Sequence, residues 1–305
     1  MKIVEQYKGI KRGYPRIKLP GKTVALLQNS RPFTLLLPLL GGYFVMQASL
    51  PAFTVPTPNP VKTWLALLSL VLIYMGGNNF NSIFDVEVDR VNKPYRPLPR
   101  GALTVREVSL FTLATYILAA LISLTVNQLF FLLAASLILS TVVYSMPPAR
   151  LKARLWINNV SQAFMRGVLG VLAAWTVHSP LTPQAFAVSA VMFTFILPAQ
   201  TSKDFGREMV GDRKFGVKTL PVVYGVDGAR KLMTIMMPTP FILLSLLAYM
   251  RVLPLETLWM TILMPVAVWI PEGVSVESNL IENQFGWAAF YACMVAFLLF
   301  FALVM

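Results

Sequence analysis

Cysteine, histidine and charged residues are scarce in this chain of 305 residues. The single cysteine, Cys293, excludes an intramolecular disulfide. The single histidine, His178, stands beside Ser179-Pro180, which is typical of a solvated connection and not of a metal ligand. Only 13% of the residues are charged, whereas 56% are hydrophobic and the mean hydropathy is +0.66. These values predict a polytopic membrane protein, built against lipid, and not a soluble domain.

Basic residues outnumber acidic ones by 26 to 13, which gives a formal net charge of +13. They are scattered between apolar stretches and do not form one basic region. We therefore expect an anionic membrane surface and anionic substrate groups as partners, and no nucleic acid. The sequence indicates no obligate protein partner.

Apolar stretches of membrane-spanning length recur along the chain, separated by turn-forming residues such as Pro147-Pro148 and Pro180. The eighth stretch is short and contains Pro265. The prediction is an all-α, polytopic integral membrane protein with nine transmembrane helices. These helices are expected at residues 32–48, 63–84, 107–126, 128–146, 157–177, 184–202, 231–250, 255–270 and 285–305.

The distribution of Lys and Arg predicts the orientation of these helices. Of the 26 basic residues, 23 lie in the amino-terminal segment or in the loops after the second, fourth and sixth predicted helices. We therefore expect a cytoplasmic amino terminus and an external carboxyl terminus, in the plasma membrane if the source is a prokaryote. Residues 1–30 are predicted to form a basic cytoplasmic arm, and residues 31–305 a single transmembrane domain.

Two short segments carry six of the 13 acidic residues, and each segment closes a long apolar stretch. The polar side chains spaced four residues apart are Asn81, Asp85 and Asp89 in the first segment and Asp204, Glu208 and Asp212 in the second. Each set would occupy one face of a helix. Both segments fall on the cytoplasmic side, 119 residues and four helices apart. This predicts a tandem four-helix pseudo-repeat about an axis along the membrane normal.

Basic residues flank both acidic segments, and this mixture predicts the ligand. Mg²⁺ takes oxygen ligands and is typically shared between one or two carboxylates and substrate phosphates. Acids alone would suit a cation carrier, whereas acids interleaved with bases favour a metal-bridged polyanion. The sequence therefore predicts that Mg²⁺ and a diphosphate bind at the cytoplasmic ends of the helices.

Three segments resemble the signatures of the UbiA-type intramembrane prenyltransferases. They run from Asn81 through Asp89 to Gly101, from Tyr144-Ser145-Met146-Pro147-Pro148 to Lys152, and from Lys203 through Asp212 to Val222. The resemblance covers the whole predicted layout and implies nine helices around a central cavity. It also implies the reaction: a polyprenyl diphosphate binds through Mg²⁺, its C–O bond ionises, and a lipophilic acceptor captures the allylic cation.

The resemblance assigns roles to the matching residues. Two Mg²⁺ ions would be held by Asn81, Asp85 and Asp89 and by Asp204, Glu208 and Asp212. The diphosphate would be bound by Lys152, Lys203, Arg213 and Lys214. The catalytic candidates are Tyr144, Asp85 and Asp204, with the Tyr144 ring near the reacting carbon. The candidates for contact with the acceptor are Arg31, Asn78, Ser145 and Arg166.

Several alternatives remain open at the level of the sequence. The acceptor could be an aromatic quinone precursor, a prenylglyceryl phosphate or a chlorophyll-type carboxylate, because relatives use all three. A membrane transporter for cations or small anions, with paired acidic helices, is the principal alternative of a different class. A lipid-binding scaffold with a decayed site is a further alternative.

Overall fold

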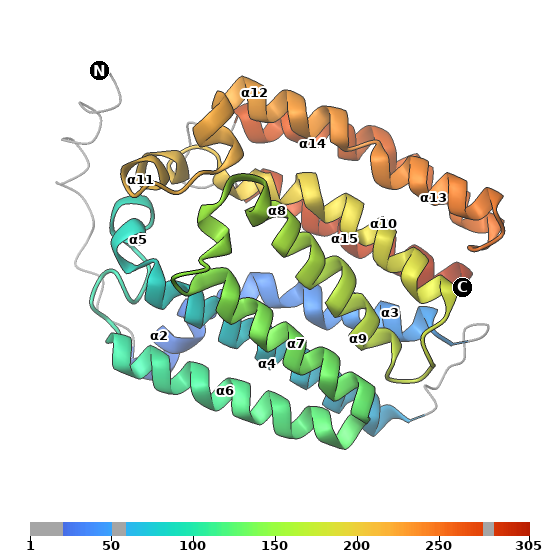
Figure 1. Ribbon diagram of the computed structural model, residues 1–305, viewed down its shortest axis with the longest axis horizontal. Helices are drawn as coiled ribbons and strands as arrows, with labels where there is room; N and C mark the ends of the chain where they lie inside the picture. The colour runs from blue at the N-terminus through green and yellow to red at the C-terminus, as the bar shows by residue number, and fades with distance from the viewer. Residues whose placement is uncertain (1–20, 51–58, 277–283) are drawn as a thin grey trace.

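The computed structural model describes residues 21–50, 59–276 and 284–305, and in these ranges it contains helices and no strand. Figure 1 shows long helices packed side by side in an elongated bundle. The short helices α5 (Val86–Asn92) and α11 (Glu208–Lys214) lie at one end of the bundle, and the carboxyl terminus lies at the other (Figure 1). The all-α prediction is confirmed.

The chain enters the bundle through a short helix followed by a break. Helix α2 spans Lys22–Asn29, and Arg31 after it has a left-handed φ of 55°. The first predicted span then consists of a 3₁₀ turn (Pro32–Leu35), a π-helical turn (Leu37–Gly41) and α3 (Gly42–Ala48). Each of the two turns has a proline in its first two residues, where the missing N–H is tolerated.

The end of the predicted basic arm is folded onto the bundle. Residues 1–20 lie outside the described residues, but α2 buries Ala25 and Asn29. Asn29 donates hydrogen bonds of 2.8 Å to Asn79 and Ser82, and Lys22 forms an ion pair of 2.9 Å with Glu107. The boundary at residue 30 stays a prediction.

Three long helices and one short helix form the first part of the bundle. Each long helix begins at a residue whose side-chain oxygen accepts a hydrogen bond from the first turn, namely Asn59, Thr104 and Asn127. Glu107 completes a capping box with Thr104. The helices are α4 (Pro60–Phe84), α5 (Val86–Asn92), α6 (Val105–Val126) and α7 (Gln128–Ser145).

The middle of the chain contains an interrupted span and the most buried of the six candidate membrane spans among the described residues. The fifth predicted span contains a π-helical turn between two α-helical pieces. The sixth buries most of its residues, including Val188 and Phe195. The elements are α8 (Leu155–Ala163), the π-helical turn (Phe164–Leu169), α9 (Gly170–Trp175), α10 (Pro183–Ala199), a 3₁₀ turn (Gln200–Asp204) and α11 (Glu208–Lys214).

The last part of the chain adds the remaining helices. The eighth predicted span changes next to Pro265 from a 3₁₀ stretch to an α-helix, and the proline is the second residue of α14, where its missing N–H is tolerated. The elements are α12 (Leu220–Met236), α13 (Thr239–Tyr249), a 3₁₀ stretch (Leu255–Leu263), α14 (Met264–Val276) and α15 (Gln284–Val304).

Six helical stretches among the described residues are long and apolar enough to cross a membrane. They are Pro60–Phe84, Val105–Val126, Gln128–Ser145, Pro183–Asp204, Leu220–Tyr249 and Leu255–Val274. Pro32–Ala48 and Ala288–Val304 are shorter apolar helices. The count of nine crossings, the pseudo-repeat and the orientation therefore stay predictions.

Apolar side chains fill the interior and also cover the outside of the bundle. Phe297 packs against Phe195 and Phe241, with ring centres 5.5 and 5.2 Å apart. On the outside, Leu139 is 63% exposed and Ile262 is 70% exposed. Such an apolar exterior suits a lipid environment.

The two rarest residue types lie away from the acidic segments. Cys293 is buried in α15. His178 is half-buried, and its Nε2 lies 2.8 Å from the Thr63 hydroxyl. His178 therefore lies in a turn and is partly exposed, with Thr63 in the first turn of α4 as its partner.

Candidate active site

A cavity of about 920 Å³ opens among the ends of α4, α5, α7 and α11 and extends into the bundle. Its lining brings together residues as far apart in the sequence as Gln28 and Ala288. All six predicted metal ligands line it, as do Tyr144, Lys152 and Lys203. The four acceptor candidates also line it, namely Arg31, Asn78, Ser145 and Arg166. One cavity therefore collects almost the whole predicted site.

The first acidic segment crosses a kink and still presents its side chains together. Helix α4 ends at Phe84, and the next residue, Asp85, leaves the helical region with a φ of −105° and a ψ of 4°. The Asp89 N–H nevertheless donates to the Asp85 carbonyl at 2.7 Å, which preserves the four-residue register. Asn81 donates to the Asp85 carboxylate at 2.8 Å, and Asp89 is buried.

The second acidic segment does not form one helix. Asp204 ends the 3₁₀ turn, Gly206 has a left-handed φ of 68°, and Glu208 begins α11. The expected helical face through Asp204, Glu208 and Asp212 is therefore wrong, because the chain turns at Gly206. The turn nevertheless leaves all three carboxylates in the cavity wall.

A close contact between α5 and α11 joins the two segments. Asn92 donates to the Glu208 backbone carbonyl at 3.0 Å and accepts from the Gly211 N–H at 2.8 Å. A Cβ at Gly211 would lie only 2.4 Å from the Asn92 side-chain oxygen. The close contact between α5 and α11 therefore requires glycine at position 211.

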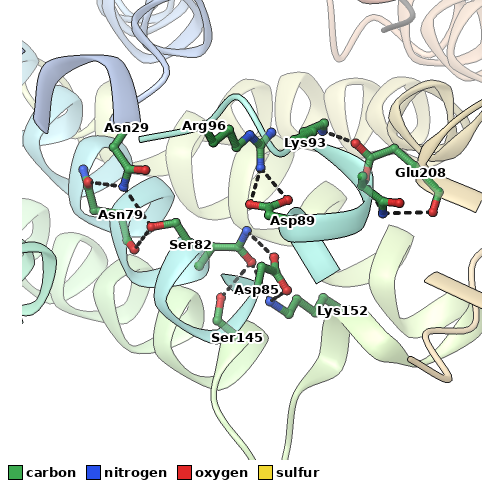
Figure 2. Close-up of polar contacts among 12 residues, drawn as sticks. Asn29, Asn79, Ser82, Asp85, Asp89, Lys93, Arg96, Ser145, Lys152 and Glu208 are labelled. Atoms are coloured by element: carbon green, nitrogen blue, oxygen red, sulfur yellow. Dashed lines mark hydrogen bonds and ion pairs between the residues drawn. The ribbon is translucent and has the colours of Figure 1, made fainter. Parts of the chain in front are cut away.

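Each of four carboxylates is paired with a basic side chain, and Figure 2 shows the pairs of Asp85, Asp89 and Glu208. The pairs are Asp85 with Lys152 at 2.5 Å, Asp89 with Arg96 at 2.8 Å, Asp204 with Lys203 at 3.1 Å, and Glu208 with Lys93. The Glu208–Lys93 pair connects α11 to the segment after α5. The site thus carries both signs of charge, as a metal-bridged diphosphate requires.

These charges shift the ionisation of the carboxyl groups. Burial disfavours the charged form of Asp85, but the Lys152 ammonium outweighs it and lowers the pKa of Asp85. Burial likewise opposes ionisation of Glu208, and Lys93 lowers its pKa. The pKa of Asp212 is raised to about 8, first by burial and then by Asp204 and Glu208. Negative charge is therefore crowded around Asp212.

The donor set fits Mg²⁺ that is shared with a substrate. Among the described residues, no group of three Asp, Glu, His or Cys side chains is gathered closely enough to hold a metal alone. The Lys152 ammonium, however, already lies 2.9 Å from the Asn81 oxygen and 2.5 Å from Asp85, so a cation is accommodated between these oxygens. Mg²⁺ commonly uses one or two carboxylates and completes its shell with water and substrate phosphates.

Tyr144 lies at the junction of the two acidic segments. Its hydroxyl donates to Asn158 at 2.7 Å, and Asn158 in turn lies 3.4 Å from the Asp204 carboxylate. The adjacent Ser145 donates to Asn81 at 3.3 Å (Figure 2). The ring of Tyr144 is thereby held beside both halves of the site.

The amino-terminal break brings two further candidates to the cavity. Asn78 donates to the Ser30 carbonyl and to the Thr34 hydroxyl, each at 2.8 Å. These bonds fix the chain on both sides of Arg31. One terminal nitrogen of the Arg31 guanidinium is buried and has no hydrogen-bond partner among the described residues. This side chain is therefore available to a ligand.

The structure does not bring Arg213 and Lys214 into the site. Both are exposed on α11 and neither lines the cavity, while Lys214 lies over the ring of Phe215. The predicted diphosphate role of these two residues is therefore wrong. The face of α11 that carries Glu208 and Asp212 turns inward, which leaves the two bases that follow Asp212 outside.

Several residues with clear contacts in the site stand outside the main candidate sets from the sequence. They are Tyr74, Asn92, Lys93, Arg96 and Asn158. Lys93 and Arg96 belong to the basic residues after the first acidic segment, which the sequence already connects with a diphosphate. Tyr74 could not be found from the sequence, since it is one aromatic residue in a long apolar helix.

The sequence profile of the UbiA prenyltransferase family matches residues 35–275. Among individual relatives, the digeranylgeranylglyceryl phosphate synthase of Halobacterium salinarum is 34% identical over 167 residues, which are 55% of this chain and 58% of that protein. The synthase of Pyrococcus abyssi is 32% identical over 61% of this chain and 65% of its own length. The chain thus matches less than two thirds of the length of these relatives.

Solved structures show the same fold. A UbiA homologue from Archaeoglobus fulgidus bound to GPP and Mg²⁺ has a TM-score of 0.65 and 20% identity, over 88% of this chain and 99% of that one. The apo form of a UbiA homologue from Aeropyrum pernix has a TM-score of 0.63 and 18% identity, over 87% and 98%. With a family match that covers most of its length, this chain belongs to the UbiA prenyltransferase family.

Proposed function

We propose that this membrane protein transfers a prenyl group from its diphosphate to a lipophilic acceptor, with Mg²⁺ as cofactor. The observation that carries the proposal is the single cavity into which both acidic segments and their paired bases converge. The family membership supports the reaction class, and the GPP and Mg²⁺ in the Archaeoglobus fulgidus homologue support the donor and the metal.

The acceptor that we favour is a prenylglyceryl phosphate of ether lipids. The support is the name of the relatives, which are digeranylgeranylglyceryl phosphate synthases. A geranylgeranyl diphosphate donor follows from the same name. An aromatic quinone precursor is the alternative acceptor, which a panel of acceptors with one labelled donor would distinguish.

The two acidic segments provide the proposed metal ligands. One Mg²⁺ would be held by Asn81, Asp85 and Asp89, and a second by Asp204, Glu208 and Asp212. When bound, Mg²⁺ neutralises the diphosphate and makes it a better leaving group. Lys152 and Lys203 would contact the diphosphate oxygens from the same wall. Arg31, Asn78, Ser145 and Arg166 remain the candidates for contact with the acceptor.

In the proposed reaction, the C–O bond between the first prenyl carbon and the diphosphate breaks, and its electron pair leaves with the diphosphate. The acceptor hydroxyl then forms the new C–O bond and passes its proton to an oxygen of the released diphosphate. The apolar cavity interior keeps water away from the allylic cation. The neighbouring Tyr144 ring face stabilises the positive charge.

Substitutions of Tyr144 should separate the ring from its hydroxyl. Tyr144→Phe keeps the ring and is expected to retain most of kcat. Tyr144→Ala is expected to lower kcat by roughly 2- to 30-fold, because a ring face over a cation contributes about 0.5–2 kcal/mol. Single-turnover rates with labelled donor would check this. Equal rates for the two variants would contradict the proposed role of the ring.

Removal of divalent metal is expected to abolish turnover in the purified protein. With geranylgeranyl diphosphate and a prenylglyceryl phosphate, diphosphate release should stop in excess chelator and return when Mg²⁺ is restored. Without Mg²⁺ the carboxylates repel the diphosphate, and the lysines alone do not neutralise it. The reaction should therefore not proceed on the lysines alone. Cation flux through proteoliposomes without diphosphate release would instead identify a transporter.

The protein is a multi-pass integral membrane protein, and we further propose its orientation. The cavity mouth and the amino terminus would face the cytoplasm, with the carboxyl terminus outside. The concentration of basic residues near α5 and α11 supports this orientation.

A further inference from the structure

Arg166 is a charged side chain in the interior of the bundle that forms no ion pair with any described residue. Its contacts are with two tyrosines. It donates to the Tyr291 hydroxyl at 3.4 Å, and its guanidinium carbon lies 6.0 Å from the centre of the Tyr74 ring. Charged residues at this depth are rare and usually face a functional cavity, and Arg166 lines the cavity of the site.

The backbone holds Arg166 in place through an unusual turn. The residue lies in the π-helical turn Phe164–Leu169, a conformation that is rare and often found at functional sites. A Cβ at Gly167 would lie 2.6 Å from the backbone nitrogen of Phe193, so the turn packs directly against α10. This packing fixes the position of the arginine without any ligand.

Arg166 lies away from the proposed diphosphate site. Its neighbour Tyr74 precedes Asp85 by eleven residues along α4, which corresponds to about 16 Å at the α-helical rise. The acidic residues of the cavity wall all belong to the two segments at the mouth. The metal-binding carboxylates are therefore not the partners of this arginine.

The groups of Arg166 and Tyr74 that face the cavity can donate hydrogen bonds. The guanidinium has five N–H donors and no acceptor. The Tyr74 hydroxyl makes no hydrogen bond to any residue of the described ranges, and the Tyr291 hydroxyl accepts from the guanidinium. Donors with no carboxylate beside them among the described residues select an anion, and the planar guanidinium matches the oxygens of a phosphate.

We propose that Arg166, held by its hydrogen bond to Tyr291, binds the phosphate group of the acceptor together with Tyr74. The inference rests on the proposed transfer reaction and names the chemistry of its acceptor: a lipid-soluble alcohol that carries a phosphate a few bonds from its nucleophilic hydroxyl. The phosphate would lie on the inner side of Tyr144, and the hydroxyl would point back toward the diphosphate. The cavity would thus have two anion sites, one for each substrate.

The test compares Arg166→Gln with the matched control Arg106→Gln, which changes an exposed arginine at the start of α6. Kinetics are measured with geranylgeranyl diphosphate and either geranylgeranylglyceryl phosphate or the same alcohol without phosphate. Arg166→Gln is expected to raise KM for the phosphorylated acceptor at least about tenfold. It should leave KM for the donor and the rate with the neutral alcohol nearly unchanged.

A binding measurement without donor or Mg²⁺ provides a second readout. The phosphorylated acceptor should raise the Tm of the wild type and the Arg106→Gln control but not of Arg166→Gln. Tyr74→Phe removes only a hydroxyl and should reduce this Tm increase by a smaller amount. It provides a second test of the site if the arginine variant misfolds. Phosphatidylglycerol is the comparison ligand and should not raise the Tm.

Specific outcomes would overturn the inference. It fails if Arg166→Gln raises KM for the donor or changes the kinetics with both acceptors equally. It also fails if the phosphorylated acceptor still raises the Tm of Arg166→Gln. Equal stabilisation by phosphatidylglycerol would assign the site to a bilayer lipid and also overturn it. If the wild type transferred no prenyl group while the Arg166-dependent stabilisation persisted, the proposed function would fail and the phosphate site would stand.

Discussion

Replacement of Asp85 by asparagine is expected to lower kcat/KM for prenyl transfer by roughly 10²- to 10³-fold, the effect of removing one preorganised electrostatic group from an active site. The amide keeps the size of the side chain but removes the negative charge, which pairs with Lys152 and would also bind the proposed metal. Asp204→Asn should have a comparable effect from the other half of the cavity. Steady-state kinetics across a range of Mg²⁺ concentrations would measure both losses.

Two controls distinguish lost chemistry from lost folding. Asp227→Asn changes a carboxylate on α12 whose side chain is 85% exposed, and it should not affect turnover. Asp85→Asn leaves the Lys152 ammonium buried without its partner, which destabilises a protein by about 3–5 kcal/mol. The double variant Asp85→Asn with Lys152→Met should regain Tm and remain inactive. Activity near the wild-type level in either Asp variant would contradict the catalytic assignment.

Substitution of Gly211 by alanine is expected to damage the site by separating α5 from α11. The new Cβ would lie 2.4 Å from the Asn92 oxygen, so the Asn92 side chain must leave its hydrogen bonds to α11 or one of the two helices must move. Overpacking of this kind costs about 1–3 kcal/mol. A displacement of about 1 Å can lower a rate by roughly 10²-fold. We therefore expect a lower Tm together with a loss of kcat of at least tenfold.

The matched control for this prediction is Gly21→Ala, because a Cβ at Gly21 meets no atom within 4 Å. It should leave both Tm and kcat unchanged. Adding Asn92→Ser to Gly211→Ala shortens the side chain that the new methyl group meets and should restore part of the Tm. If the double variant were less stable than the sum of the single changes, the steric explanation would be wrong.

Much of the site could be predicted because its chemistry is local in the sequence. The four-residue spacing of Asn81, Asp85 and Asp89 survives a kink, since the Asp89 N–H still bonds the Asp85 carbonyl. The second segment shows where such reasoning fails. Gly206 can adopt a left-handed φ, and nothing in the local pattern of acids reveals that it does so.

The contacts that complete the site depend on pairing between distant segments. Asn92 meets Gly211 across 119 positions, and Lys152 meets Asp85 across 67. An apolar helix gives no local signal for Tyr74, whose position matters only because a π-helical turn brings Arg166 beside its ring. The exposure of Arg213 and Lys214 is likewise set by how α11 rotates against α5.

The sequence alone determined that this chain is a helical membrane protein and predicted most of the polar residues that line its cavity, because hydropathy and the spacing of charged residues are local properties. The tertiary structure decided which carboxylates pair with which bases, which basic residues turn away, and where the isolated arginine lies. Those outcomes depend on close packing between helices far apart in the chain. No periodicity within a single helix encodes that packing.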